Sequence, residues 1–279
     1  MNIYKSEAGR LLLEEKYREA LKTWPVEHET LTVPTREGDT FVVASGPVGA
    51  PPVVALHGSM SNTLRWLGSV SEWARDHRVY AVDIIGEPGL SAPSRPPLDS
   101  EAYALWLSDV LRELGIERAS VVAESLGGWL ALDFAIRRPE QVTSLALLTP
   151  AGVGRQKMSV LFKALFWRLF GEWGQRRALS TAVGVELDPV TASYVLLISK
   201  NFNPRTKPLP VFSDEALRGL KMPLLTVVGA RDMMIDTTQT ALRLGAAVPH
   251  ARIEVLPSAG HMLPDQTKMI TEFLAAVHA

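Results

Sequence analysis

The stretch that decides the fold is Val121-Val122-Ala123-Glu124-Ser125-Leu126-Gly127-Gly128, in which an apolar run meets a serine and then becomes helix-like. A strand that turns sharply into a helix crowds the positions two before and two after the turn residue, so both need very small side chains. Ala123 and Gly127 occupy those positions. The pattern predicts that the Ser125 hydroxyl projects above a sheet as a nucleophile, and that the Leu126 amide lies at a helix N-terminus as an oxyanion donor.

Short apolar runs like the one before Ser125 recur along the chain, with helix-like patterns between them. Strands that are buried on both faces have this composition, and they belong to parallel sheets that are covered by helices. The alternation predicts an α/β fold with a mostly parallel, doubly wound sheet. The expected strands are 53–56, 79–82, 120–123, 145–148, 224–228 and 252–256, and the expected helices are 63–76, 101–114, 126–137 and 237–247.

The N-terminal part of the chain has a different pattern. Residues 7–23 form an amphipathic helical pattern that Trp24-Pro25 ends. Two short stretches of alternating or β-rich sequence then flank the turn residues Glu37-Gly38-Asp39. This arrangement predicts an antiparallel β-hairpin from strands 29–33 and 40–44.

Residues 152–213 interrupt the alternation because they contain no good strand pattern. An ordinary helix facing the core would explain their apolar periodicity, but an insertion between two strands, above the carboxyl edge of the sheet, favours a lid. The expected division is therefore a core of 1–151 and 214–279 with a helical cap of 152–213, in which 201–210 is an extended return path. The apolar face of the cap comprises Met158, Leu161, Phe162, Leu165, Phe166, Leu169, Phe170 and Trp173.

Composition narrows the class of protein. With 279 residues, 47% of them hydrophobic, the chain can bury a large core. A formal net charge of −1 provides no global field for nucleic acid or anionic lipid, so a neutral or apolar small molecule is the expected partner. The absence of cysteine excludes disulfides, thiolate catalysis and cysteine-ligated zinc. No apolar run is long enough to span a membrane, and the N-terminal residues do not resemble a signal peptide, which favours a cytoplasmic location.

A serine hydroxyl needs a general base and an acid that orients the base. His261 is the best base, because it lies in a short loop after the last predicted strand. Asp232 is the favoured acid, since it directly follows strand 224–228. Asp236 is its competitor, although it also suits the cap of the helix at 237, and Asp265 fits the dipole of a helix that opens at Pro264.

The segment Leu56-His57-Gly58-Ser59-Met60 also follows a predicted strand. A glycine here lets backbone amides approach a carbonyl oxygen, so the amide of Ser59, or less favourably that of Met60, is the expected second oxyanion donor. His57 is a conceivable base. Its place directly after a buried strand favours a structural imidazole that braces this loop.

These motifs, in this order and over nearly the whole chain, resemble the α/β-hydrolase superfamily. The helix and hairpin before the first motif, and the helical insertion, are similar to capped bacterial carboxylesterases. Two departures from the usual pattern are Ala123 in place of glycine and a loop after Asp83 that is one residue longer, for which a turn role of Ser91 is expected. The motifs are Leu56-His57-Gly58, Asp83-Ile84-Ile85-Gly86 with Gly89-Leu90-Ser91, Ala123 to Gly128, Gly229-Ala230-Arg231-Asp232 and Gly260-His261.

The resemblance implies a serine hydrolase for small, largely apolar carboxylic esters that needs no metal or cofactor. A hydrolase of carbon–carbon bonds on the same triad would need a cation for the substrate carboxylate, and Arg65, Lys157 or Arg168 could serve. Perhydrolase and lactonase activities are also compatible with the triad, whereas a ligand receptor without turnover is disfavoured because all three triad members are present. The expected pocket residues are Met60, Phe162, Phe166, Trp167 and Met262.

Overall fold

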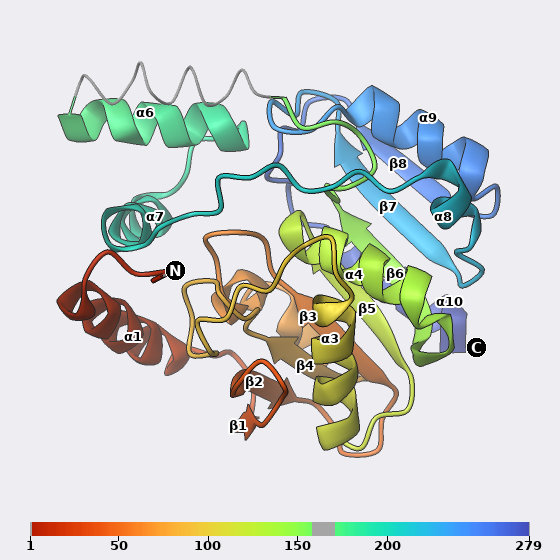
Figure 1. Cartoon of the computed structure of the whole chain (residues 1–279), viewed down its shortest axis with the longest axis horizontal. Helices are drawn as coiled ribbons and strands as arrows, with labels where there is room; N and C mark the ends of the chain where they lie inside the picture. Colours follow the sequence, from red (N-terminus) through yellow and green to blue (C-terminus); the bar gives the residue numbers. More distant parts are fainter. Residues whose placement is uncertain (1, 158–170, 279) are drawn as a thin grey trace.

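One sheet of eight strands organises the molecule (Figure 1). The computed structural model describes residues 2–157 and 171–278. The strand order is β1-β2-β4-β3-β5-β6-β7-β8, with β1, β2 and β4 paired antiparallel and all other neighbours parallel. The predicted hairpin and the mostly parallel sheet are confirmed. The strands are β1 (His28–Val33), β2 (Thr40–Ser45), β3 (Pro52–Leu56), β4 (Arg78–Val82), β5 (Ala119–Glu124), β6 (Val142–Leu148), β7 (Leu224–Gly229) and β8 (Arg252–Leu256).

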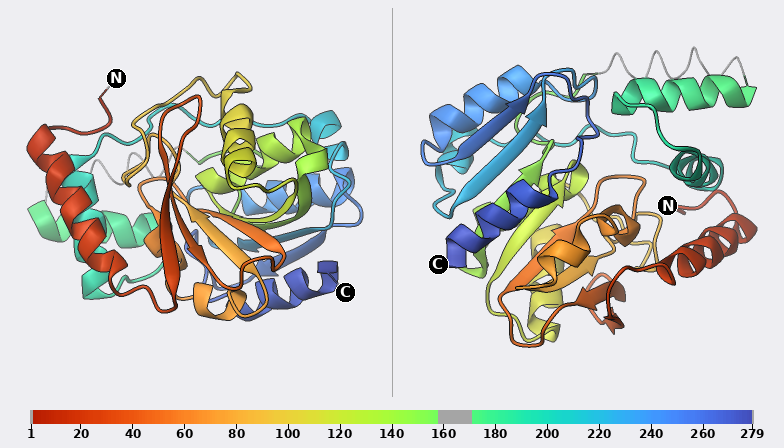
Figure 2. Two further views of the ribbon diagram at one scale, coloured as in Figure 1. Left: turned by 90° about the horizontal axis from the view of Figure 1, so that it is seen from below. Right: turned by 180° about the vertical axis from the view of Figure 1, so that it is seen from behind.

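The central strands are apolar without interruption because both faces of the sheet are covered. Successive side chains point to opposite faces, so Val54 and Leu56 join one core cluster while Val53 and Ala55 join the other. Helices α3, α4, α8 and α9 pack on the first face, and α1, α2 and α10 pack on the second (Figures 1 and 2). Their bounds are α1 (Glu7–Leu21), α2 (Val70–Trp73), α3 (Ala102–Glu113), α4 (Leu126–Arg137), α8 (Asp214–Arg218), α9 (Thr237–Ala247) and α10 (Thr267–His278).

Two predicted helices differ from the observed ones. The expected helix 63–76 is divided into a 3-10 turn, η1 (Thr63–Trp66), and the short α2, with Gly68 between them. Glycine weakens a helix interior, and Asn62 caps the 3-10 turn through the Leu64 amide. The last helix, α10, begins at Thr267 and not at Pro264. The Asp265 carboxylate accepts a hydrogen bond from the Thr267 amide at 2.9 Å, so Asp265 does lie at the start of the helix.

The chain order reverses at β3, which pairs with β4 on one side and with β5 on the other. Ligands of open α/β sheets bind at such a switch point, outside the carboxyl ends of the strands. The loop that follows β3 and the turn that follows β5 meet there. The predicted nucleophile and oxyanion loop therefore lie at the position where this class of fold builds its sites.

In the segment between β6 and β7, the helices α6 (Gly171–Val183) and α7 (Pro189–Asn201) lie over this edge (Figure 1). An extended path follows α7, as predicted. The two ends of the segment meet, because the Phe212 amide donates to the Gly152 carbonyl at 2.8 Å. The division of the chain into a core and a cap at residues 152 and 213 stays a prediction.

The N-terminal arm packs on this same segment, which the sequence did not indicate. Tyr4 forms a β-bridge with Phe202, directly after α7, and the Lys5 amide donates to the Asn201 carbonyl at 2.9 Å. Ile3, Tyr4, Leu13, Ile198 and Phe202 form a core cluster of their own, separate from the two sheet faces. The first residues and α1 therefore hold α7 from outside (Figure 2).

Within residues 2–157 and 171–278, no helix has the length and apolar character that crossing a membrane requires. The cytoplasmic location that the N-terminal sequence favours stays a prediction.

Candidate active site

Ser125 occupies a strained turn between β5 and α4. Its backbone has φ 50° and ψ −108°, a conformation that a residue with a side chain rarely adopts. A methyl group at Gly127 would lie only 2.4 Å from the Leu56 carbonyl oxygen, which explains the glycine at this position. Ala123 is fully buried in the core, so its small side chain fits where glycine is commoner. The strain and the close packing together raise the Ser125 hydroxyl above the carboxyl edge.

His261 lies beside Ser125. Its Nε2 atom is 3.0 Å from the Ser125 Oγ, and its Nδ1 atom is 2.8 Å from Oδ2 of Asp232. Thr149, directly after β6, fixes the loop that carries His261, because its hydroxyl donates to the His261 carbonyl at 3.2 Å. The structure thus brings together the three side chains that the sequence proposed as nucleophile, base and acid.

Asp232 is buried and has hydrogen bonds on both carboxylate oxygens. Oδ1 accepts the amides of Met234 at 2.6 Å and Ile235 at 2.9 Å, while Oδ2 faces His261. Burial alone would raise the pKa of Asp232, but the bond and charge of His261 and these two amides outweigh it and leave the pKa below its ordinary value. Asp232 therefore stays ionised and can stabilise an imidazolium.

Asp236 has the alternative role that its position suggested. It is the N-cap residue of α9, and its side chain accepts the Gln239 amide at 3.0 Å. A carboxylate in this place satisfies a free amide of the helix and complements its dipole. The geometry joins Asp232, and not Asp236, to His261.

The loop after β3 lies against the nucleophile turn. The Gly127 amide donates to the His57 carbonyl at 3.1 Å, and a methyl group at Gly58 would be in ordinary contact with the Ser125 Cβ at 3.5 Å. Leu126 begins α4 beside Ser125. The amide of Met60 is already engaged, because it donates to Oε2 of Glu87 at 2.8 Å. Of the two predicted oxyanion donors, the Ser59 amide is therefore the better candidate.

His57 has a structural role, because both of its ring nitrogens are hydrogen-bonded to backbone groups. Its Nε2 atom accepts the Ile84 amide at 3.0 Å, so Nδ1 carries the proton and donates to the Gly58 carbonyl at 2.7 Å. Complete burial lowers the pKa of His57 to about 4. A neutral ring with both nitrogens in use fixes the loop after β3, and neither nitrogen is bonded to Ser125.

Of the three basic residues predicted as ligands for a substrate carboxylate, Arg65 and Lys157 have partners within the protein. Arg65 forms a two-point ion pair with Glu124, at 2.7 and 3.0 Å. Burial would raise the pKa of Glu124, and the charge and hydrogen bonds of Arg65 reverse that shift. The ammonium group of Lys157 donates to the Asp232 carbonyl at 2.8 Å. Arg168 lies outside the described residues.

The expected pocket residues are only partly described. Met60 is half-buried and packs against the cluster that Ile198 and Phe202 form with the N-terminal residues. The Met262 amide donates to the Val183 carbonyl at the end of α6. Both residues thus lie where the body meets the overlying helices. Their pocket role stays a prediction, and Phe162, Phe166 and Trp167 lie outside the described residues.

Ser91 has the turn role that was expected of it. Its hydroxyl donates to the Asp83 carbonyl at 2.6 Å and accepts the Phe41 amide at 2.8 Å. Asp83 itself accepts the amides of Thr63 and Leu90 and the hydroxyl of Tyr17. Together these bonds fix the longer loop after β4.

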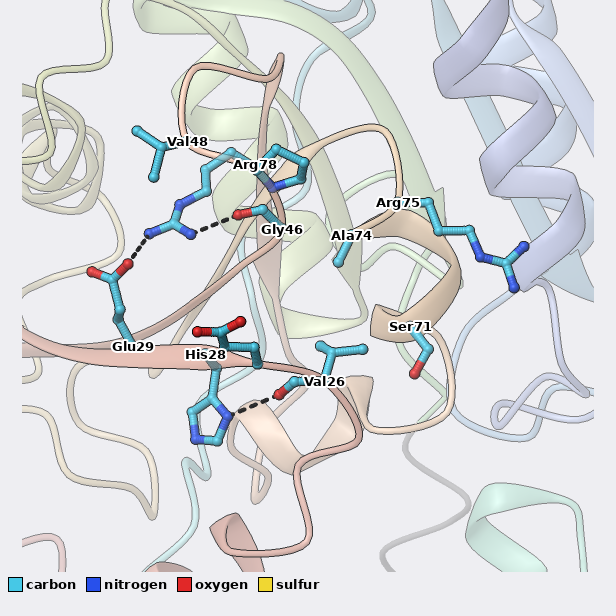
Figure 3. Close-up of a pocket in the computed structure, with 11 residues that line it drawn as sticks. Val26, His28, Glu29, Gly46, Val48, Ser71, Ala74, Arg75 and Arg78 are labelled. Carbon is cyan, nitrogen blue, oxygen red and sulfur yellow. Dashed lines mark hydrogen bonds and ion pairs between the residues drawn. The ribbon is translucent and has the colours of Figure 1, made fainter.

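A pocket of about 480 Å³ lies elsewhere on the molecule (Figure 3). It is lined by residues at the start of β1, after β2 and around α2, and by Arg78, the first residue of β4. Since β4 is parallel to β5, its first residue lies at the amino edge of the sheet, opposite Ser125. Arg78 is occupied there by Glu29 and the Gly46 carbonyl. This pocket is therefore separate from Ser125, His261 and Asp232.

Comparison with known proteins agrees with this geometry. A model of the alpha/beta hydrolase family matches residues 53–276. The carboxylesterase nap of Bacillus subtilis (strain 168) is 32% identical over 262 residues, which cover 89% of this chain and 86% of that protein. The predicted resemblance to bacterial carboxylesterases is thus confirmed.

Two solved structures extend the likeness to the whole chain. Naproxen esterase (carboxylesterase NP) from Bacillus subtilis superposes with a TM-score of 0.86 at 30% identity, covering 99% of this chain and 100% of that one. Carboxylesterase CesB (YbfK) from the same organism has a TM-score of 0.84 at 28% identity, covering 98% and 99%. The chain belongs to the alpha/beta hydrolase family, beside the bacterial carboxylesterases.

Proposed function

We propose that the protein is a serine hydrolase that cleaves small, largely apolar carboxylic esters through an acyl-enzyme. The observation that carries the proposal is the continuous chain of contacts from the Ser125 Oγ through both ring nitrogens of His261 to Asp232, with distances of 3.0 and 2.8 Å. Nucleophile, base and orienting acid within hydrogen-bond reach are the arrangement that activates a serine.

In the acylation step, Ser125 Oγ attacks the ester carbonyl carbon while Nε2 of His261 takes the hydroxyl proton. Asp232 stabilises the imidazolium that forms. The carbonyl oxygen becomes an oxyanion, and the amides of Leu126 and Ser59 stabilise it by donating hydrogen bonds. The tetrahedral intermediate collapses when the carbon–oxygen bond to the alcohol breaks, and His261 returns the proton to the leaving alkoxide.

In the deacylation step, a water molecule attacks the acyl carbon, and His261 accepts the water proton. The second tetrahedral intermediate releases the carboxylic acid, and Ser125 regains its proton from His261. Attack of hydrogen peroxide in place of water on the same acyl-enzyme would release a peracid, and a cyclic ester could acylate Ser125 by opening its ring, so perhydrolase and lactonase activities are variants of one mechanism.

The charges near the site and the names of the relatives support this substrate class. Arg65 and Lys157 are occupied by Glu124 and by the Asp232 carbonyl, which favours an uncharged ester over the anionic substrate of a carbon–carbon bond hydrolase. One related structure is named for naproxen, an aryl acid, so an ester of that acid is a rational first substrate. The apolar residues predicted for the cap would contact such an acyl group.

The test is active-site labelling followed by hydrolysis assays. A fluorophosphonate probe should modify Ser125 alone, as mapped by mass spectrometry, and Ser125→Ala should prevent labelling. With p-nitrophenyl esters of two to eight carbons and with naproxen methyl ester, Ser125→Ala should lower kcat by at least about 1000-fold, since nucleophile and base act as a unit. Activity above a few per cent in Ser125→Ala would refute the nucleophile. Absence of labelling in the wild type would favour a ligand receptor.

A further inference from the structure

Glu87 is a buried carboxylate at the edge of the proposed site. It lies in the loop after β4, and no part of it is exposed to solvent. Its Oε2 atom accepts the Met60 amide at 2.8 Å and the Ser59 hydroxyl at 3.2 Å. A charged group in this position contacts the backbone of the proposed oxyanion loop directly.

The bond to Met60 matters because of the backbone conformation there. Met60 has φ 58°, a left-handed conformation that costs free energy in a residue with a side chain. A charge-assisted bond to its amide stabilises that turn. The Gly58–Ser59 peptide, whose N–H group is the proposed Ser59 donor, lies one residue before this turn, so the turn helps to set the direction of that N–H group. Glu87 thus holds the loop in the shape that the oxyanion requires.

A negative charge beside an oxyanion hole would oppose the reaction unless it were neutralised. Arg205 supplies the opposite charge, because its Nε atom lies 2.9 Å from Oε1 of Glu87. Its guanidinium also donates to the Tyr103 hydroxyl and lies over the Tyr103 ring, 5.4 Å from the centroid. Only 12% of the Arg205 side chain is exposed, so solvent screens the pair weakly.

Arg205 comes from the extended path that follows α7. Arg95 makes a parallel connection, donating to the Gly86 and Asn203 carbonyls, each at 2.8 Å. The loop that contains Glu87 is therefore joined to the segment that overlies the site. The ion pair between Glu87 and Arg205 therefore fixes both the oxyanion loop and the extended path that follows α7.

We infer that Glu87 is a positioning residue that holds the oxyanion loop through the Met60 amide, and that Arg205 neutralises its charge and couples the loop to the segment above it. The kinetic part of this inference rests on the proposed ester hydrolysis. An interaction that serves mainly the oxyanion acts in the transition state, so its loss lowers kcat with little change in KM.

The kinetic experiment is a charge-rescue comparison on a p-nitrophenyl ester. Arg205→Met leaves the Glu87 charge unpaired, and kcat should fall about tenfold or more while KM stays within about twofold. Glu87→Gln in the Arg205→Met background removes that charge but keeps an acceptor for the Met60 amide. The double variant should recover kcat to within about threefold of the wild type, because the buried negative charge that Arg205→Met leaves unpaired is gone.

Arg243→Met is the matched control. Arg243 also ties the overlying segment to the body, since it bonds to Asp214 and to the Val153 and Phe212 carbonyls, yet it does not contact the oxyanion loop. It should lower the melting temperature about as much as Arg205→Met while leaving kcat within about twofold of the wild type.

A second measurement does not depend on activity. In Glu87→Ala the Met60 amide loses its acceptor, so deuterium uptake by peptides that cover residues 57–66 should become about tenfold faster or more, while peptides from β6 and β7 are unchanged. If the wild-type protein hydrolyses no ester, the proposed function fails and this exchange measurement alone decides the positioning role.

Three results would overturn the inference: a wild-type kcat in Arg205→Met, a double variant slower than Arg205→Met alone, or unchanged exchange of residues 57–66 in Glu87→Ala. Melting curves of every variant separate a folding defect from a positioning defect. A variant that does not fold is replaced by Glu87→Gln/Arg205→Met, in which no unpaired charge is buried.

Discussion

Oδ2 of Asp232 faces the Nδ1 atom of His261 at 2.8 Å, while its partner oxygen Oδ1 accepts the amides of Met234 and Ile235. The two amides fix the rotation of the carboxylate, and the carboxylate fixes the ring. Asp236 lies four residues further on and accepts the Gln239 amide at the start of α9. Two aspartates in one loop thus have separate tasks, one in orienting the His261 ring and one in capping a helix.

Exchange of each aspartate for asparagine should separate these tasks. Asp232→Asn keeps the shape but favours the wrong tautomer of His261, so kcat should fall by about 10³ to 10⁴-fold. Asp236→Asn remains a good helix cap and should keep kcat within about twofold. Steady-state hydrolysis of a p-nitrophenyl ester measures both. If Asp236→Asn, and not Asp232→Asn, had the strongly lowered kcat, the assignment of the acid would be wrong.

The two small residues around Ser125 should respond differently to substitution. Ala123→Gly removes one buried methyl group and adds backbone freedom, which should cost about 1 kcal/mol of unfolding free energy and leave kcat within about threefold. Gly127→Ala places a methyl group 2.4 Å from the Leu56 carbonyl oxygen and 2.6 Å from that of His57. Because both neighbours are backbone atoms, the turn must shift.

We expect Gly127→Ala to lose at least about 100-fold in kcat, or to accumulate as insoluble protein, because a shift of about 1 Å at the nucleophile is enough for such a loss. Urea denaturation and ester hydrolysis of the two variants provide the comparison. Equal activity of Gly127→Ala and Ala123→Gly would show that the turn is not as tightly packed as the distances indicate.

The sequence predicted those parts of the fold in which the hydrophobic pattern of a short segment indicates its burial. Strand 53–56 is apolar at every position because both faces are covered, and Ser125 and Asp232 come just after strands of this kind. His261 lies in the loop after the edge strand β8, which is only partly buried. Since parallel strands end at one edge, knowing the strands was enough to bring Ser125, Asp232 and His261 together. The two helix boundaries that differ, at Gly68 and at Thr267, depend on caps and turns.

The parts that were missed join residues far apart in the chain. Glu87 and Arg205 are separated by 118 positions, and no periodicity of either segment indicates that they meet. An acidic residue in a loop after a buried strand was the one available signal for Glu87. The bridge between Tyr4 and Phe202 also joins residues far apart in the chain. The N-terminal arm has too few residues to show a pattern that would predict this contact. The sequence allows Arg65 as a ligand for a substrate carboxylate, and only the packing shows that it pairs with Glu124.

His57 should make the protein sensitive to acid. Its pKa is lowered to about 4 in the folded state from an ordinary value of 6.5, so below pH 6.5 the unfolded chain binds a proton that the folded protein does not. The unfolding free energy therefore falls as the pH is lowered from 6.5 towards 4. Asp83 opposes this trend, because burial raises its pKa to about 6, and the folded protein then binds the proton first.

The difference between the wild type and His57→Gln isolates the histidine. Glutamine does not titrate, so the stability advantage of the wild type over this variant should be about 2 kcal/mol smaller at pH 5.0 than at pH 7.5. Urea denaturation at the two pH values measures it, with the Asp83 contribution common to both proteins. An advantage that is equal at the two pH values would mean that His57 titrates normally in the folded protein.

The contact of the N-terminal arm with α7 should be needed for the stability of the overlying segment. Tyr4 is buried, its ring packs edge-on against Phe202 with centroids 5.9 Å apart, and its hydroxyl donates to the Gly89 carbonyl at 3.3 Å. Tyr4→Ala should cost about 3 kcal/mol of unfolding free energy and should speed proteolysis between residues 184 and 210, because α7 loses its outer support. Leu11→Ala is the control, since Leu11 is 52% exposed on α1 and its loss should cost less than about 0.5 kcal/mol. Limited proteolysis with mass mapping distinguishes the two variants, and equal cleavage of α7 in both would mean that the arm does not hold this helix.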